Sequence, residues 1–136
     1  MTAKEYLSQA YRLDKRIERK IEDRDRMRSR LVKATAQLTG MPRGGNADWT
    51  DAAVHVMEYE EQLNREIVEL CKLKREIRDT IDAVEEKRYR DLLEMRYITG
   101  MSWEKIAVDM HYSYVHVLRL HGEALKVVKV PGEMGG

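Results

Sequence analysis

Apolar residues recur at helical spacing along the first 38 residues of the chain. Residues 3–38 contain neither glycine nor proline. One apolar stripe recurs there at spacings of three and four residues and their sums, through Ala3, Leu7, Ala10, Ile17, Ile21, Leu31 and Leu38. Asp14, Arg24 and Arg28 interrupt this stripe. The pattern predicts one long helix over residues 3–38 with a narrow, partly polar seam.

A break and a new helix start follow this segment. Residues 39–46 contain three glycines and one proline, which stop a helix. Thr50 or Asp51 supplies the next start signal. We therefore expect a loop over about residues 39–50.

A heptad seam continues beyond the break, with Glu60 and Lys74 as its polar exceptions. Its apolar members are Val56, Leu63, Ile67, Leu70, Ile77, Ile81 and Val84. Together the two helices predict an antiparallel, coiled-coil-like hairpin over residues 1–79. Such a hairpin is an assembly arm, a partner-docking arm or a spacer.

The two helices of this hairpin carry opposite charge. Residues 2–38 have a net charge of +5 and residues 51–79 a net charge of −3, which favours their lying side by side. The run of arginines over residues 24–30 is first interpreted as a solvated helix face. The alternative is a patch that contacts phosphate or an acidic partner.

Residues 80–130 show a different pattern, with three helices and two serine caps. The first helix is expected from about Ile81 to Ile98 and ends at Gly100. Ser102 caps a short helix over residues 103–110, and Ser113 caps a third helix that runs to about Val128. A short helix, a three-residue turn and a second capped helix are typical of a helix-turn-helix.

The inner faces of the second and third helices support this prediction. Their expected core residues are Ile106, Ala107, Met110, Val117, Leu120, Ala124 and Val128. His111 stands at the turn position that requires a positive φ angle, which histidine tolerates better than most residues. We expect residues 131–136 to form a flexible tail. The fold class is therefore all-α: a long N-terminal hairpin followed by a three-helix helix-turn-helix domain.

The segment LLEMRYITGMSWEKIAVDMHYS and the following V-x-x-L-x-x-x-AL pattern resemble region 4 of sigma-70-type transcription factors. More closely, RYITGMSWEKIA followed by YSYVHVLRLHGEAL resembles the phage-encoded, sigma region 4-like regulators of the RinA and ArpU type. The resemblance covers about residues 80–130. It implies a regulator of late genes in phages and prophages of Gram-positive bacteria. Its implied partners are double-stranded DNA, bound by helix 113–128, and RNA polymerase.

Outward positions of the two capped helices are the candidate DNA contacts. On the third helix they are Ser113, Tyr114, His116, Arg119 and Lys126, with Glu123 beside them. By resemblance they correspond to the promoter-contacting face of region 4. Ser102 and Lys105 would lie near the DNA backbone. Arg119 is the best candidate for a base contact, because a guanidinium pairs with O6 and N7 of guanine.

Other residues of this segment are expected in the core. Tyr112, which follows the turn, should pack in the core of the motif, and Trp103 should cover the edge of that core. His121 is expected to pack against the first helix, with Gly122 permitting a close approach.

The sequence contains no recognisable catalytic or metal-binding pattern. We therefore expect that the protein is not an enzyme and binds no cofactor. His111, His116 and His121 are spaced five apart, about 140° around a helix, and share no face for a metal. No glycine-rich phosphate loop or nucleophile elbow occurs.

Composition indicates the cellular compartment in which the protein is expected. No apolar stretch reaches the length of about 18 residues that a membrane span needs, and the first residues do not resemble a secretory signal. Cys71 is the single cysteine, so no intrachain disulfide is expected. These features predict the reducing cytoplasm of a bacterial host cell.

The net charge of −1 over residues 80–136 is low for phosphate binding. It leaves several alternatives open: weak binding by a monomer, a contribution from the basic first helix, a dimer, or action beside RNA polymerase. We expect a homo-oligomer, most simply a dimer. Two other functions fit the same pattern: a small terminase subunit that binds DNA for phage genome packaging, and a polymerase-binding module without direct DNA contact.

Overall fold

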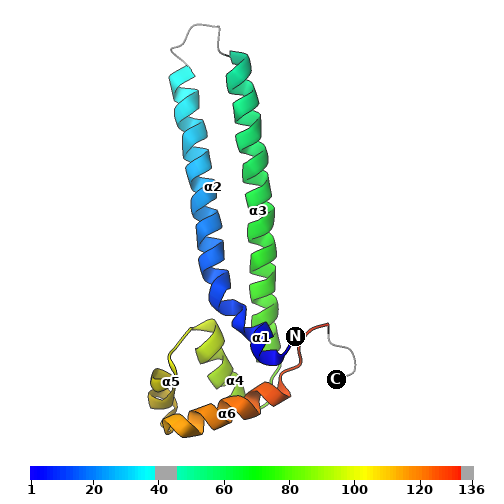
Figure 1. Cartoon of the computed structure of the whole chain (residues 1–136), viewed down its shortest axis with the longest axis vertical. Helices are drawn as coiled ribbons and strands as arrows, with labels where there is room; N and C mark the ends of the chain where they lie inside the picture. Colours follow the sequence, from blue (N-terminus) through cyan, green and yellow to red (C-terminus); the bar gives the residue numbers. More distant parts are fainter. Residues whose placement is uncertain (39–45, 133–136) are drawn as a thin grey trace. The chain divides into compact units, whose positions relative to one another are not determined.

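The computed structural model describes residues 1–38 and 46–132, and these residues form helices and no strand. The elements are α1 (Ala3–Ser8), α2 (Ala10–Leu38), α3 (Asn46–Asp82), α4 (Lys87–Leu93), the π-helical turn η2 (Glu94–Ile98), α5 (Trp103–Met110) and α6 (Tyr114–Val127). Their order can be followed in Figure 1. The expected all-α fold is confirmed. The predictions for residues 39–45 and 133–136 lie outside the described residues.

The chain divides into two compact units. One, the hairpin unit, consists of residues 15–71. The other, the helix-turn-helix unit, is built from both ends of the chain, residues 1–14 and 72–136. None of the described helices is both long enough and apolar enough to cross a lipid bilayer.

In the hairpin unit, α2 and α3 run antiparallel. Arg24 Nη1 donates to Asn64 Oδ1 at 3.0 Å, and Arg28 pairs with Glu60. Arg28 lies four residues after Arg24 on α2, and its partner Glu60 lies four residues before Asn64 on α3. The two contacts therefore fix the antiparallel register of the helices. Arg24, Arg28 and Glu60 are polar interruptions of the predicted seams. They interrupt the stripes because they pair across the hairpin.

The second helix of the hairpin begins at Asn46, earlier than the predicted start at Thr50 or Asp51. The helix resumes directly after the glycines at positions 44 and 45. Residues 46–50 contain neither glycine nor proline, so nothing in them breaks a helix. The loop prediction for residues 46–50 is therefore wrong.

The predicted single helix over residues 3–38 is also wrong, because the chain breaks at Gln9. The Thr2 hydroxyl caps α1 by accepting from the Glu5 amide at 3.1 Å. At the break, the Gln9 amide donates to the Tyr6 carbonyl at 3.3 Å. α1 contacts α6, and Tyr6 and Leu7 are both buried. The separate turn of α1 thus places two adjacent residues in the core.

The first helix expected in the C-terminal segment, over residues 81–98, is interrupted as well. α3 continues to Asp82, the chain turns over residues 83–86, and α4 begins at Lys87. Val84 is buried within this turn, and its carbonyl accepts from Arg90 Nη1 at 3.1 Å. This contact ties the turn to α4.

The π-helical turn η2 extends the buried side of α4. The Thr99 amide donates to the Glu94 carbonyl at 3.0 Å, one residue further back than in an α-helix. Leu92, Leu93 and Tyr97 are all buried. The helix ends at Ile98, and Gly100, two residues further on, has a φ of 78° that suits glycine.

Candidate nucleic-acid interface

The two capped helices and their turn have the geometry of a helix-turn-helix. The Ser102 hydroxyl accepts from the Lys105 amide at 3.2 Å, and the Ser113 hydroxyl accepts from the His116 amide at 3.1 Å. Each serine therefore satisfies one free amide at a helix N-terminus. Both predicted caps are confirmed, and α5 has its predicted bounds.

His111 sits in the left-handed region, with φ 61° and ψ 37°. Its amide donates to the Val108 carbonyl, and the Tyr112 amide donates to the Ala107 carbonyl at 3.0 Å. These bonds close the end of α5 and turn the chain towards α6. The positive φ angle expected at His111 is confirmed.

The inner faces of α5 and α6 form the core of the motif. Ile106 and Val117 are fully buried, and α5 contacts α6. The other buried residues of the two helices are Ala107, Leu120, His121 and Ala124. Met110 and Val128 are half-buried. Ala107, one of the expected core residues, is buried as predicted.

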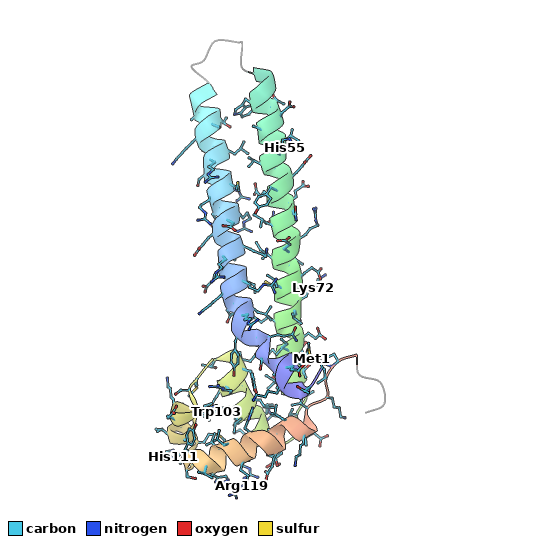
Figure 2. All side chains as sticks on the ribbon, viewed as in Figure 1. Met1, His55, Lys72, Trp103, His111 and Arg119 are labelled. Carbon is cyan, nitrogen blue, oxygen red and sulfur yellow. The ribbon has the colours of Figure 1, made fainter. Side chains whose placement is uncertain are left out.

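Most of the predicted DNA contacts are exposed. On α6 and its cap, Ser113, Tyr114, Arg119 and Lys126 are exposed, and Figure 2 shows Arg119 on the side of α6 away from α4. Ser102 and Lys105 are exposed at the start of α5.

His116 differs from these residues, since it is only half-exposed. Its ring stacks on Tyr112, with 4.3 Å between centroids. Tyr112, which the sequence places in the core, is itself half-buried.

The outward face of α6 also carries apolar side chains, which were not among the predicted contacts. Val115 is 66% exposed and Leu118 is 39% exposed. On α5, Val108 is 72% exposed. Methyl groups at such positions can contact the methyl group of thymine. A second stripe on α6 could have predicted these exposed apolar residues, because it lies opposite the buried stripe. It consists of Val115, Arg119, Gly122 and Lys126.

Gly122 belongs to this outward stripe and not to a close helix contact. It is exposed, and a Cβ atom added there would meet no atom within 4 Å. The prediction that Gly122 permits the close packing of His121 is therefore wrong.

A cluster of rings holds the inner side of the motif. His121 is buried, and its Nε2 lies 2.8 Å from the Tyr97 hydroxyl in η2. The predicted packing of His121 against the first helix of the segment is confirmed. Trp103 contacts the His121 ring edge-on at 4.6 Å between centroids, and Tyr97 stacks on Tyr11 at 5.4 Å. Trp103 is half-buried, as expected for the edge of the core.

The Arg96 guanidinium completes this cluster. It lies 4.2 Å from the centroid of the Trp103 ring and 5.6 Å from that of Tyr11, and its Nη1 donates to the Met101 carbonyl at 3.0 Å. Cation–π contacts of this kind hold the segment before α5 against the start of α5 and of α2. The cluster joins α6, η2, α5 and the N-terminal residues.

Burial shapes the protonation of this cluster. Desolvation lowers the pKa of His121 to about 4, and the positive charges of Lys4 and Arg96 act in the same direction. Desolvation also raises the pKa of Tyr97 to about 12, with the opposing charge of Arg96 a smaller influence. Both groups are therefore neutral at pH 7, which suits a buried hydrogen bond.

The charge around the two helices is mixed. Lys105, Arg119 and Lys126 are the basic residues of α5 and α6, and Glu104, Asp109 and Glu123 are the acidic ones. Among the described residues, no group of three or more histidine, cysteine or acidic side chains is placed to hold a metal ion.

Comparison with known proteins gives one match. A family model described as a protein of unknown function, DUF1492, matches residues 31–129. No curated protein and no solved structure matches the chain.

Proposed function

The chain belongs to the DUF1492 family, and we propose that it is a DNA-binding transcription regulator of the kind that phages and prophages encode. One observation carries this proposal: two serine-capped helices joined by a three-residue turn leave the outward face of α6 exposed. Regulation of late genes in the bacterial cytoplasm is the role suggested by the sigma region 4-like residues 80–130.

Base reading is assigned to α6. In helix-turn-helix proteins the first residues of the second helix enter the major groove. Tyr114 and Arg119 are exposed there, and Val115 adds an apolar contact between them. Lys126 lies further along the same side, while Ser102 and Lys105 at the start of α5 suit the phosphate backbone.

A second candidate function is binding to RNA polymerase without direct DNA contact. It is favoured by the exposed apolar residues Val108, Val115 and Leu118, and by the balanced charge of α5 and α6. Apolar side chains exposed on a protein surface can become part of an interface when a partner covers them.

We also propose that the protein forms a homodimer through the hairpin unit. On α3, Val54, Met57 and Val68 are 45–55% exposed and recur at heptad spacing outside the buried stripe of Ala53, Leu63 and Leu70. An antiparallel helix pair buries one stripe per helix, and a second copy would cover these exposed apolar side chains. Sedimentation of the purified protein tests this assembly.

Selection of binding sites from a random duplex library tests DNA reading. The selected site is then compared with random DNA in gel-shift titrations of the wild type, Arg119→Ala and the control Arg78→Ala. Arg78 is an exposed arginine of α3. We expect Arg119→Ala to lose affinity for the selected site by about 1–3 kcal/mol, while its affinity for random DNA changes little and Arg78→Ala behaves as the wild type.

Two results would contradict the proposal. Failure to enrich any site would remove sequence-specific reading, and co-purification with RNA polymerase would then support the second candidate. An equal loss of affinity for the selected site and for random DNA in Arg119→Ala would show that Arg119 contacts only phosphate.

A further inference from the structure

Eight of the ten basic residues of α2 fall into two sets on different sides of the helix, and Arg12 and Arg16 belong to neither set. One set belongs to the seam of the hairpin unit. There Lys20 Nζ lies 2.6 Å from Glu66 Oε2, Arg24 donates to Asn64, and Arg28 pairs with Glu60. These three cations thus pair with polar side chains of α3 and are less available to bind another molecule.

The second set forms a line on the opposite side of α2. We call this set the basic stripe; it consists of Lys15, Arg19, Arg26, Arg30 and Lys33. All five are exposed, and together with the exposed Glu22 they recur at spacings of four and three residues. The line covers five helical turns, or about 27 Å at 1.5 Å per residue.

The basic stripe is poorly compensated within the protein. Across the described parts of the chain, Lys15, Arg19, Arg30 and Lys33 make no ion pair, while Arg26 pairs with Asp23 on its own helix. Cations four residues apart on a helix repel each other and slightly destabilise it. A line of such cations is therefore a surface that an external anion would stabilise.

We propose that the basic stripe binds the phosphate backbone of double-stranded DNA without regard to base sequence. The inference rests on the proposed function and supplies what the C-terminal segment lacks. Residues 80–136 have a net charge of −1, whereas sequence-independent affinity for DNA comes from lysine and arginine that displace counterions. The hairpin unit contributes these charges.

The character of the stripe favours DNA over an acidic protein surface. All six positions of the line are charged, and Val32, the exposed apolar residue in this part of α2, lies off it. Protein interfaces have cores depleted in charge and enriched in aromatic residues. B-form DNA presents about one negative charge per 1.7 Å of its axis, so a line of cations about 27 Å long faces a densely charged surface where it crosses the phosphate strands.

A salt titration on random-sequence duplex DNA tests the inference. The stripe variant Arg19→Gln/Arg30→Gln/Lys33→Gln is compared with the control Arg65→Gln/Arg75→Gln/Arg78→Gln, which removes the same charge from exposed positions of α3. Glutamine keeps helix propensity, and circular dichroism checks that both variants fold. Each lost phosphate contact lowers the slope of log K against log salt by about 0.9. We expect the slope of the stripe variant to fall by about 2 to 3, and that of the control to stay unchanged.

The outcomes separate this inference from the proposed function. An unchanged slope in the stripe variant overturns the inference, even where a selected site is still preferred over random DNA. Loss of self-association with an unchanged slope also overturns it, because the stripe would then bind a second copy. A reduced slope in a protein that prefers no site upholds the stripe and contradicts sequence-specific reading.

Discussion

The Tyr97 hydroxyl and His121 Nε2 lie 2.8 Å apart in the interior of the helix-turn-helix unit. This buried hydrogen bond ties α6, the proposed recognition helix, to the π-helical turn that follows α4. Lys4 and Arg96 act on the same ring from α1 and η2. The orientation of α6 therefore depends on a histidine that must stay neutral.

Acid should destabilise the protein through His121. The unfolded chain binds a proton at this ring near pH 6.5, whereas the folded protein binds it only near pH 4. The contribution of neutral His121 to the free energy of unfolding is therefore fully present above about pH 6.5. It is lost as the pH decreases towards 4. At pH 5 the loss in unfolding free energy should be about 2 kcal/mol relative to pH 8.

Urea unfolding of the wild type and of His121→Asn at pH 8 and pH 5 measures this loss. The variant lacks the titrating ring, so its stability should change less between the two pH values. The same pH dependence in both proteins would assign the acid sensitivity to other groups.

The N-terminal residues should be required for the helix-turn-helix unit to fold. Leu7 is fully buried in α1, which contacts α6. Removing its side chain leaves a cavity, so Leu7→Ala should lower the unfolding free energy by about 2–5 kcal/mol. Urea denaturation measures this change, and Val32→Ala, at a side chain that is 63% exposed, serves as the control. A loss below about 0.5 kcal/mol for Leu7→Ala would show that α1 is dispensable.

Arg28 and Glu60 should be coupled across the hairpin unit. Their side chains pair directly, but the arginine side chain is 61% exposed, so the coupling should be small. A double-mutant cycle with Arg28→Gln and Glu60→Gln should give about 0.3–1 kcal/mol.

The matched cycle combines Arg30→Gln with Glu60→Gln. Arg30 belongs to the basic stripe and should show no coupling to Glu60. Equal coupling in the two cycles would mean that the effect is general electrostatics and not the pairing that sets the register.

The local features of α5 and α6 were predictable because short-range chemistry determines them. Ser102 and Ser113 cap their helices through hydrogen bonds that span three residues. The positive φ angle of His111 follows from the turn that joins the two helices. The polar interruptions Arg28 and Glu60 were also visible, although the sequence did not show that they pair.

Features that depend on distant contacts escaped the sequence analysis. Nothing near Gln9 disfavours a helix, and the break there accompanies the burial of Tyr6 and Leu7. The π-helical turn likewise accompanies the burial of Tyr97. Val115 was not among the predicted contacts, because those were chosen from side chains that carry a polar group. Only its position opposite Val117 and Leu120 marks it as exposed.

The division of one unit between both ends of the chain has a consequence for synthesis on the ribosome. Residues 1–14 emerge before the hairpin unit, yet their partners within their own unit begin at Lys72. The hairpin unit, residues 15–71, has all its contacts available earlier and is free to close while translation continues. Leu7 and its neighbours stay exposed throughout that interval, so nascent chains of this protein are open to chaperones and proteases until the last helix leaves the exit tunnel.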